Sequence, residues 1–584
     1  MTDLYRIVRS RVPSLLLGLV TLLFGLSGVA WAQTRYLPDA ARVPTIKLNE
    51  GPSGELGLPP LTPPPPKGFD QESIWNMKVV GFANDLGCGG SDQEWIEHQG
   101  NREILYAGSG AGTALNPITH RKEACGVQIY DVTDPAHPVF LYNIPGDAAG
   151  GGRSHVFVCG GDTLPNAVKG DYYLLTHAGP TKTAHGRMEI WNVTNPSAPT
   201  LLTTVLRGLT EYHKSWWECN TGVAYLIAGK KGDGWHERQH AYIYNLSNPA
   251  KPRFIREWGL PGGQPGADVA TQKACVNSHG PNCYEGTINP PPAIHQAYST
   301  STGVMTATGK KSIVIFPAGV NRHGVIQIVD RKKLLNGCNP AFNPSASANC
   351  ATSPTQADLL HAQIGYVVEP PYIGAHNATP VFNVPIPEDQ YGYTVSPLSK
   401  TRGPQHWDIA VSTSEAYGPP SCAFGTYDHN ATLLDITDEQ TPWPIATLNV
   451  PQFPGDFCDK GARFGDHHTN WQIYAPYYGR LAFITWFNAG LRVFDIRDPL
   501  NPREVAYFIQ APNANTRVSC GTARDPKACR KVAYMDIAEV GDRGYIYAQD
   551  RAGSGITILK LTGEALNVVT GHEEGRAAPG APKH

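Results

Sequence analysis

The amino-acid sequence predicts an all-β fold, a seven-bladed β-propeller in which an N-terminal strand closes the last blade. Two observations lead to this prediction: a strand-and-turn unit that recurs along most of the chain, and a lone strand-like segment before its first copy. The composition agrees, because 41% apolar and 17% charged residues in a chain of 584 are typical of a globular protein with a large core.

The recurring unit alternates apolar residues and then reaches an acidic or amide residue close to a proline. Its copies occupy residues 126–138, 188–199, 241–252, 431–442 and 491–502, with degenerate copies at 325–334 and 555–563. An Asp or Asn side chain can bind backbone amides ahead of it, while proline fixes φ and ends the strand. We therefore expect the chain to reverse at each copy.

Each unit is predicted to contain four antiparallel strands, because β-rich runs also precede and follow the turns. The acidic or amide residues that end the strand in six successive motifs are 61, 53, 85, 105 and 60 residues apart. They are Asp131, Asn192, Asn245, Asp330, Asp435 and Asp495. The two longest spacings carry insertions. A lone four-stranded sheet cannot bury both faces, so such units stack radially as propeller blades. A β-sandwich, the structural alternative, does not explain the repeated turn.

The two ends of the repeat region are expected to meet. The last unit stops near Leu561 without an outer strand, and residues 76–83 form a strand-like segment that would supply it and remove an open sheet edge. The expected domains are a signal peptide (1–32), a proline-rich extended arm (33–72), the propeller (73–563) and a flexible C-terminal tail (564–584).

The N-terminus predicts export. Arg6, Arg9 and Arg11 precede an apolar run at residues 15–29, which is followed by Ala-Trp-Ala at 30–32, with small residues where a signal peptidase reads. A retained membrane anchor is the alternative, but the run is short for a full span. We expect a secreted or periplasmic protein without an integral membrane span after cleavage. The net charge of -2 gives no reason to expect a nucleic-acid partner.

The cysteines fit an oxidising compartment. All twelve follow the expected cleavage site. Three pairs are close in sequence and are predicted to form disulfides: Cys275 with Cys283, Cys338 with Cys350, and Cys520 with Cys529. Three longer bridges are expected among the other six, whose pairing the sequence leaves open: Cys88, Cys125, Cys159, Cys219, Cys422 and Cys458. A thiolate metal site is the alternative, but no CxxC pair occurs.

The repeat resembles a known family. GLRVFDIRDPLNP at residues 490–502 is the clearest of the motifs that resemble the LVIVD repeat of secreted bacterial and archaeal proteins, and the resemblance covers about residues 76–563. It implies propeller blades and an extracytoplasmic location, and it implies no reaction. The selenium-binding proteins, which include methanethiol oxidases, offer a looser analogy as propellers with functional histidines.

Histidines recur at one phase of the repeat, near the start of the predicted innermost strands. They are His155, His213, His295, His376 and the doublet His467 and His468. Equivalent positions on innermost strands form a ring around the propeller axis, so these imidazoles are expected to hold a transition metal, copper, zinc or iron. Asp466 or Asp536 would either complete the shell or orient a ligand from outside. The alternative is that the rings fill the channel wall, with their nitrogens bound to backbone carbonyls.

Two functions from different classes follow. The first is a metal-dependent extracytoplasmic oxidoreductase acting on a small molecule, which would enter past the insertions, where Tyr284, Trp407 and Tyr417 would line a pocket. The second is a non-catalytic surface or periplasmic binding module that recognises a protein or glycan. No GxSxG elbow, P-loop or dinucleotide fingerprint occurs, so no nucleotide cofactor is expected, and no catalytic residue is assigned.

Overall fold

The recurring turn has the geometry that its sequence predicts. In five copies the Asp or Asn that ends the strand accepts a hydrogen bond of 2.8–3.1 Å from the backbone amide two residues ahead. These acceptors are Asp131, Asn192, Asn245, Asp435 and Asp495. The Asp or Asn three positions later repeats the bond within the same turn. The chain therefore reverses after each of these strands.

The structure is a computed structural model. It describes residues 71–147, 151–180, 185–268, 291–320, 324–370, 373–385, 406–415, 430–450, 457–472, 474–522 and 525–571. These residues belong to one compact unit, Thr62–His584. The predicted signal peptide and nearly all of the proline-rich arm lie outside the described residues, as does the end of the predicted tail.

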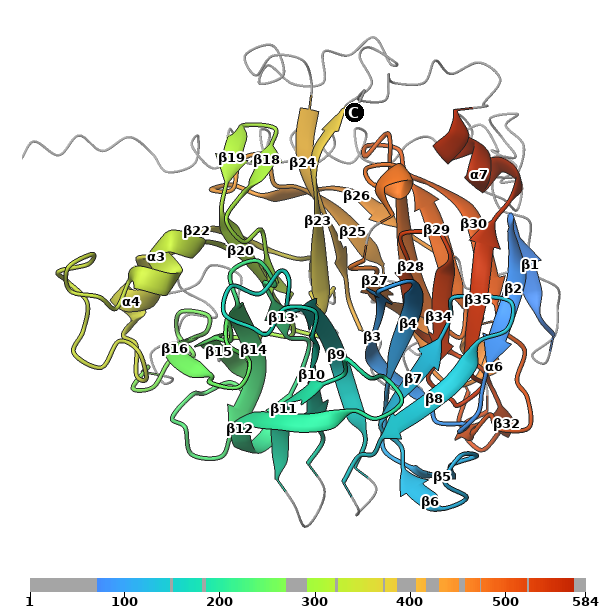
Figure 1. Ribbon diagram of the computed structural model, residues 1–584. Helices are drawn as coiled ribbons and strands as arrows, with labels where there is room; N and C mark the ends of the chain where they lie inside the picture. Colours follow the sequence, from blue (N-terminus) through green and yellow to red (C-terminus); the bar gives the residue numbers. More distant parts are fainter. Residues whose placement is uncertain are drawn as a thin grey trace, which may run out of the picture. The chain divides into compact units, whose positions relative to one another are not determined.

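The described chain is an all-β fold of antiparallel sheets with a propeller-like arrangement (Figure 1). Each group below is a run of four antiparallel strands in the order in which they pair. The first group is β3 (Gly90–Gln99), β4 (Arg102–Ser109), β7 (Val127–Asp131) and β8 (Val139–Ile144). The next is β9 (Arg153–Gly160), β10 (Tyr172–Ala178), β11 (Gly186–Asn192) and β12 (Thr200–Tyr212). It is followed by β13 (Trp216–Trp217), β14 (Val223–Lys230), β15 (His240–Asn245) and β16 (Arg253–Trp258).

The later groups continue this pattern. They are β17 (Tyr298–Ser299), β20 (Ile313–Ala318), β21 (Val325–Asp330) and β22 (Gln363–Val368); then β23 (Asn377–Pro385), β24 (His406–Thr413), β25 (Ala431–Asp435) and β26 (Trp443–Leu448). After them come β27 (Phe464–Thr469), β28 (Leu481–Phe487), β29 (Leu491–Asp495) and β30 (Arg503–Ile509), with β1 (Ser73–Trp75) paired outside β30. Short hairpins are β5 (Thr113–Leu115) with β6 (Lys122–Ala124), β18 (Val304–Thr306) with β19 (Gly309–Lys311), and β31 (Val518–Cys520) with β32 (Cys529–Lys531).

The last group joins the two ends of the repeat region. It consists of β33 (Met535–Val540), β34 (Ile546–Asp550), β35 (Ile556–Leu561) and the N-terminal strand β2 (Met77–Ala83). Met77 pairs with Leu561 and Ala83 with Ile556, so blue and red strands lie side by side in Figure 1. The predicted pairing of the N-terminal strand with the last unit is confirmed.

The core lies between neighbouring groups. One hydrophobic cluster contains Ile409 of β24 and Trp486 of β28, so it joins two consecutive groups. Another contains Leu105 of β4 and Ile558 of β35, so the last group packs against the first. Each sheet therefore buries both faces against its neighbours, as radial stacking requires.

Helices are few and short in the described residues. They are α3 (Arg331–Asn336), α4 (Gln356–Leu360), α6 (Phe457–Lys460), the 3-10 helix η3 (Ala475–Tyr477) and α7 (Gly563–Thr570). The tail was expected to be flexible from residue 564, but α7 extends the ordered chain to the left-handed cap Gly571. Ala565 and Val568 on this helix are buried in the last sheet interface, which is the physical reason for the difference.

The described cysteines are oxidised. Two of the short predicted disulfides, Cys338–Cys350 and Cys520–Cys529, are present. The structure resolves two longer pairings that the sequence left open, Cys88–Cys125 and Cys159–Cys219. Cys275, Cys283 and Cys422 lie outside the described residues, and Cys458 is disulfide-bonded. Among the described helices, none combines the length and apolar character that crossing a bilayer requires.

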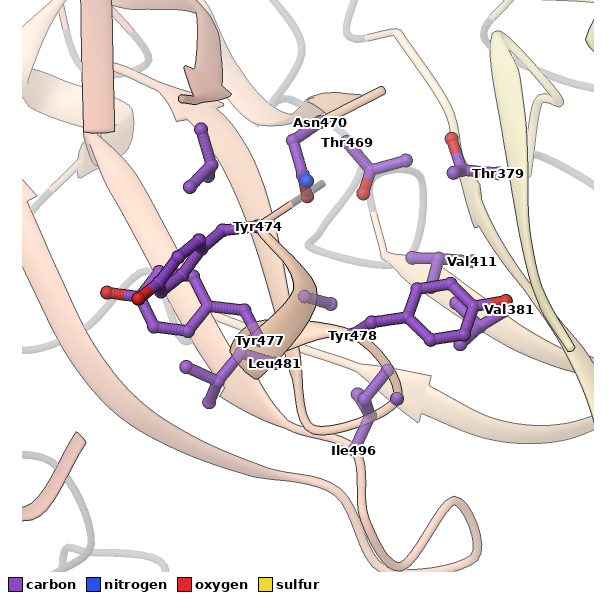
Figure 2. A pocket seen from close by; sticks show the side chains of 13 residues that line it. Thr379, Val381, Val411, Thr469, Asn470, Tyr474, Tyr477, Tyr478, Leu481 and Ile496 are labelled. Atoms are coloured by element: carbon purple, nitrogen blue, oxygen red, sulfur yellow. The ribbon is translucent and has the colours of Figure 1, made fainter. Parts of the chain in front are cut away.

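A small cavity lies between the groups that contain β24 and β28 (Figure 2). Tyr474 and Tyr477 lie on one side of it, and the ring of Tyr478 lies beside Val381 and Val411 on the other. Its volume is about 30 Å³, and the Tyr478 hydroxyl accepts a hydrogen bond of 2.7 Å from the backbone of Phe382. A space of this size suits about one water molecule, so it is a packing feature between sheets.

Candidate metal centre

The predicted histidines lie at the start of the first strand of successive groups, where the repeat places them. His155 lies on β9, and His467 and His468 lie on β27. The other three precede first strands: His376 lies directly before β23, and His213 and His295 lie three residues before the first residue of β13 and of β17. The phase that the sequence predicted is therefore the phase observed.

These imidazoles converge. Ring centroids lie 5.2 Å apart for His155 and His213, 4.4 Å for His213 and His295, 5.1 Å for His213 and His376, and 4.6 Å for His376 and His467. His468 follows, with its ring 6.5 Å from that of His467. His213 is half-buried and the other five are buried. Side chains up to 313 residues apart thus share one site; metal binding itself stays a prediction.

Backbone carbonyls fix the tautomer of four of these rings. The Nδ1 atoms lie 2.7–3.1 Å from carbonyl oxygens, in the pairs His213 with His295, His295 with Ala293, His376 with His467, and His467 with Asp536. A carbonyl can only accept, so each Nδ1 carries the proton and Nε2 keeps its lone pair. This is the neutral tautomer, oriented from behind, in which histidine binds metal ions.

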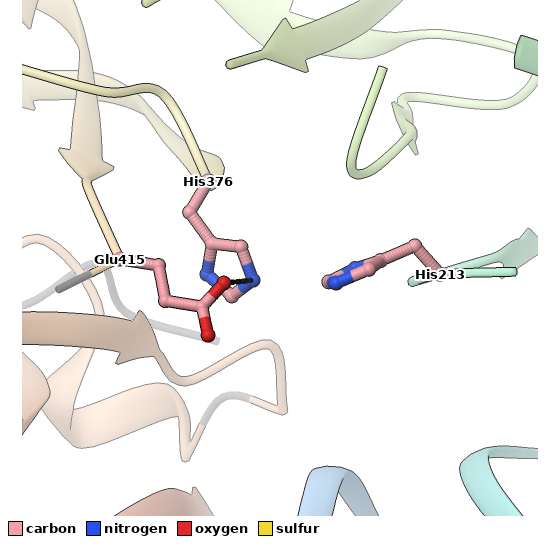
Figure 3. Close-up of side chains that lie close together, drawn as sticks. All are labelled: His213, His376 and Glu415. Atoms are coloured by element: carbon pink, nitrogen blue, oxygen red, sulfur yellow. Dashed lines mark ion pairs between the residues drawn. The ribbon is translucent and has the colours of Figure 1, made fainter. Parts of the chain in front are cut away.

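Two of the imidazoles and a carboxylate form a possible ligand set. One ligand atom from each of His213, His376 and Glu415 lies within 4.8 Å of the others. Figure 3 shows the Glu415 carboxylate beside the His376 ring, with His213 facing them from the opposite side. Oε2 of Glu415 lies 3.8 Å from Nε2 of His376. Tetrahedral ligands at about 2.0–2.1 Å from an ion lie roughly 3.3 Å apart, so an ion would draw the three groups together by about 1 Å.

Glu415 is oriented by a neighbouring cation. Arg463 donates a hydrogen bond of 2.6 Å from Nη1 to Oε1 of Glu415, which leaves Oε2 on the side of His376. Such a hydrogen bond to a ligand carboxylate is the arrangement by which proteins position metal ligands.

Neither carboxylate that the sequence suggested belongs to this ligand set. Asp466 accepts hydrogen bonds from the amide and hydroxyl of Ser414, at 2.6 and 2.8 Å. The carboxylate of Asp536 accepts from Arg551 at 2.7 Å, and both its backbone oxygen, at 2.7 Å, and its carboxylate Oδ1, at 3.5 Å, lie near Nδ1 of His467. Asp536 therefore lies where it can orient His467 from outside, as one alternative expected. The carboxylate grouped with His213 and His376 is that of Glu415, two residues after β24.

A seventh histidine belongs to the cluster. His177 on β10 is fully buried, and its ring lies 5.1 Å from that of His155. Its Nε2 lies 3.2 Å from the hydroxyl of Ser215, whereas its Nδ1 has no hydrogen-bond partner. His177 pairs with Ser154 across the antiparallel strands β9 and β10. In this group of strands, His155 lies near the start of the first strand and His177 near the end of the second, which is antiparallel to it. A search of the sequence for histidines at these two positions would have identified His177.

The backbone at His155 is strained. Its φ of 56° lies in the left-handed region, and the pairing of β9 with β10 shifts register at the neighbouring position, between Thr176 and His177. Residues other than glycine rarely adopt this conformation, and such strain concentrates at functional sites.

A lysine also lies inside the cluster. Lys214 is fully buried, and its Nζ lies 3.0 Å from Nδ1 of His468 and 3.4 Å from Nε2 of His376. On the far side, Nε2 of His468 lies 3.2 Å from the carboxylate of Glu539. Sequence reasoning missed Lys214 because it concentrated on the histidine next to it.

Burial keeps the central imidazoles neutral. It lowers the pKa of His295 to about 4. It also lowers the pKa of His376 well below the ordinary value, and the Lys214 ammonium adds to this effect. For His177 the pKa is lowered well below normal by burial and then by His155. Neutral imidazole is the form that binds metal ions, so these rings are ready ligands at physiological pH.

A short segment of the sequence matches a zinc-protease motif but does not form the helix which that motif requires. Residues 236–240 read HERQH, which matches the HExxH pattern of zinc proteases. That chemistry requires a helix that presents both histidines on one face. Here the segment is a bend that leads into β15, with His236 exposed and His240 buried against Trp235. The two histidines therefore do not form a zinc site of that kind.

Trp407 does not line a substrate entrance, although the sequence had suggested that it would. Trp407 is buried in a hydrophobic cluster with Val381 and Ile409, so it packs between sheets. Tyr284 and Tyr417 lie outside the described residues. His406, which competes with His376 for the same phase, lies on β24 with its Nδ1 3.1 Å from the carbonyl oxygen of Asn383.

A second group of possible ligands lies on the surface. His98, Glu103 and Asp542 approach one another, but the side chains of His98 and Asp542 are 47% and 61% exposed. Arg543 forms an ion pair with Glu103 and already neutralises it. This group is a surface ion-pair network.

Two comparisons of the sequence with known proteins find no match, and a comparison with solved structures finds distant ones. No protein-family model matches the sequence, and no curated protein matches it. Among solved structures, the chain is similar to Sqt1 of Saccharomyces cerevisiae, with a TM-score of 0.39 and 8% sequence identity. That alignment covers 83% of this chain and 99% of Sqt1.

Proposed function

We propose that the chain is an exported seven-bladed β-propeller of the LVIVD-repeat kind, and that its axial histidines hold a transition metal for an oxidoreductase reaction on a small molecule. The seven four-stranded groups, the pairing of β2 with β35 and the packing of the last group on the first support a closed ring. The disulfides are compatible with an oxidising compartment.

One observation carries the metal proposal: two acceptors face each other in a buried site. Nδ1 of His376 donates to the carbonyl of His467, so its Nε2 has a lone pair and no proton, and this atom lies 3.8 Å from the carboxylate of Glu415. Two acceptors in a buried site favour a cation close to both. Lys214 lies 3.4 Å from Nε2 of His376 and Arg463 lies 2.6 Å from Oε1 of Glu415, and a metal ion between the two groups would contact both of them directly. The imidazole of His213 completes a set of ligand atoms around that point.

The composition of the ligand set favours a reactive metal over a structural one. Structural zinc sites use four protein ligands, whereas catalytic sites keep three and leave a position open. Two imidazoles and one carboxylate are the set of non-haem iron oxygenases, and zinc enzymes use it as well. His213 is half-buried, so solvent can reach this side of the set. Iron or copper at this position would serve an oxidoreductase.

Metal analysis of the purified, mature protein tests the proposal. We expect about one iron, copper or zinc ion per chain in the wild type, and loss of most of it in His376→Ala and in the double variant His213→Ala, His295→Ala. His137→Ala is the matched control, because His137 is an exposed histidine in the turn after β7 that contacts only Asp134 in its neighbourhood. Far-UV circular dichroism checks that each variant is folded.

The result also separates the two classes of function. A redox-active metal supports the oxidoreductase, and a folded wild type that binds no metal would support the alternative, a binding or interaction module in which the histidines are structural. Zinc alone would keep the metal centre and replace the oxidoreductase by a hydrolytic enzyme.

A further inference from the structure

A buried ammonium group shares the open side of the proposed metal centre. Lys214 is fully buried, and its Nζ lies 3.3 Å from Nδ1 and 3.4 Å from Nε2 of His376. Nε2 of His376 is also the atom that faces Glu415, at 3.8 Å. An atom bound to a metal at about 2.0–2.1 Å can therefore also lie within hydrogen-bond distance of Lys214. A ligand at this position meets two positive centres at once.

Other cations surround the same point. Arg463 contacts Glu415 directly, and Arg238 is near enough to His295 to lower its pKa further. Three carboxylates oppose these cations: Glu415 itself, Glu211, which lies 3.7 Å from Arg238, and Glu539, which lies 3.2 Å from Nε2 of His468. With Lys214 there are three cations, so the formal charges balance, and a divalent ion would give the site an excess of two positive charges. The centre thus favours ligands with negative charge.

We propose that the open metal position takes an anionic group, such as a carboxylate or another small oxyanion, and that Lys214 donates a hydrogen bond to it. This inference rests on the proposed metal centre and names its substrate class: small molecules with a negative charge at the atoms that bind the ion. A neutral substrate would leave the Lys214 ammonium facing the metal with no anion between them, which is unfavourable in a buried site.

Lys214 is suited to this role by its rigidity. The backbone of Lys214 donates to the carbonyl of His295 at 3.1 Å, and its side chain ends against His468 as well as His376. The ammonium is therefore held beside the ligand set by two different groups of strands. Binding an anion there requires little ordering of the lysine, which is the condition for a strong charge-assisted hydrogen bond.

Anion binding to the metal-loaded protein tests the inference. Wild type is loaded with Co(II), its metal content is measured, and azide is titrated while the visible absorption of the metal is recorded. Lys214→Met is expected to weaken azide binding roughly tenfold or more, because it removes one charge-assisted hydrogen bond. Lys214→Arg keeps the charge and is expected to recover most of the affinity. Lys231→Met, at an exposed lysine on the loop after β14, is the matched control and is expected to bind as the wild type does.

The possible results are distinct. Equal azide affinity in wild type and Lys214→Met, at equal metal content, would overturn the anion subsite and leave the metal centre in place. Absence of bound metal in the wild type would remove the proposed function and this inference together. If Lys214→Met does not fold, the comparison of acetate with acetamide in the wild type decides: the inference requires clearly tighter binding of acetate, together with its retention in Lys214→Arg.

Discussion

A buried carboxyl next to the histidine cluster makes a strong prediction about pH. Glu539 is fully buried, and burial raises its pKa to about 8, although the backbone amides of Gln472 and Trp471 and the charge of Lys214 act in the opposite direction. In the unfolded chain its pKa is near 4.5. The folded state therefore binds this proton more tightly, so the residue costs stability progressively as pH rises from about 4.5 to about 8.

The size of the effect follows from the two pKa values. A difference of about 3.5 pH units at about 1.36 kcal/mol per unit corresponds to about 5 kcal/mol above pH 8 and to about 3 kcal/mol at pH 7. Glu539→Gln is uncharged like the protonated acid and nearly the same size, and its amide oxygen can accept from the backbone amide of Gln472. We expect this variant to be more stable than the wild type by about 3 kcal/mol at pH 7, and about equally stable at pH 4.5.

Urea unfolding followed by circular dichroism at several pH values between 4.5 and 8.5 measures this difference, with metal removed from both proteins. Glu72→Gln, at an exposed glutamate, is the matched control and is expected to follow the wild type throughout. A Glu539→Gln variant that is less stable than the wild type by the same amount at every pH would refute the reasoning, since it would show that the carboxylate is charged and favourable in the folded state.

Two further substitutions test the fold. Replacing Cys159 and Cys219 by serine opens a covalent loop of 60 residues between β9 and the turn that follows β13; we expect a loss of about 4 kcal/mol in urea unfolding, and an unchanged midpoint would contradict the assigned pairing. Met77→Ala, at a buried residue of β2 paired with Leu561, is expected to cost about 2–4 kcal/mol in the free energy of unfolding, while Val79→Ala on the exposed side of the same strand is expected to cost less than 1. Equal effects of the two would argue against a closing role for β2.

Local chemistry made much of the fold predictable. The Asx turns that end the repeat strands depend only on residues within a few positions, so the sequence places them correctly at Asp131 and Asp495 and at their equivalents. The pairing of β2 with β35 could be anticipated because one unit lacked an outer strand and one segment was left over. Helix α7 was missed because Ala565 and Val568 gain their burial from a sheet interface that no local pattern reveals.

The site was predictable in part, for the same reason. The repeat phase located the six histidines, because equivalent positions of stacked sheets meet. It did not locate Glu415, His177 or Lys214, which lie outside that phase. These three residues reach the histidine cluster because of the register in which their strands pair and the path of the chain after those strands. The repeat motif does not reveal either of these. Asp466 directly precedes His467 in the sequence, but its carboxylate accepts hydrogen bonds from Ser414.

The histidines either bind a metal ion or fill the channel wall. Both interpretations predict that Nδ1 binds a backbone carbonyl, and they differ in what surrounds Nε2. A ring that fills the channel wall binds carbonyls, and Nδ1 of His213, His376 and His467 does so. A satisfied buried imidazole would then offer Nε2 to a donor. Nε2 of His376 has the Lys214 ammonium at 3.4 Å on one side and the Glu415 carboxylate at 3.8 Å on the other, and Glu415 also accepts from Arg463. Both interpretations allow this arrangement, so the metal content of the purified protein distinguishes them. If an ion binds, the three ligands leave at least one of its positions unfilled, and the charge of the ion itself favours an anion there.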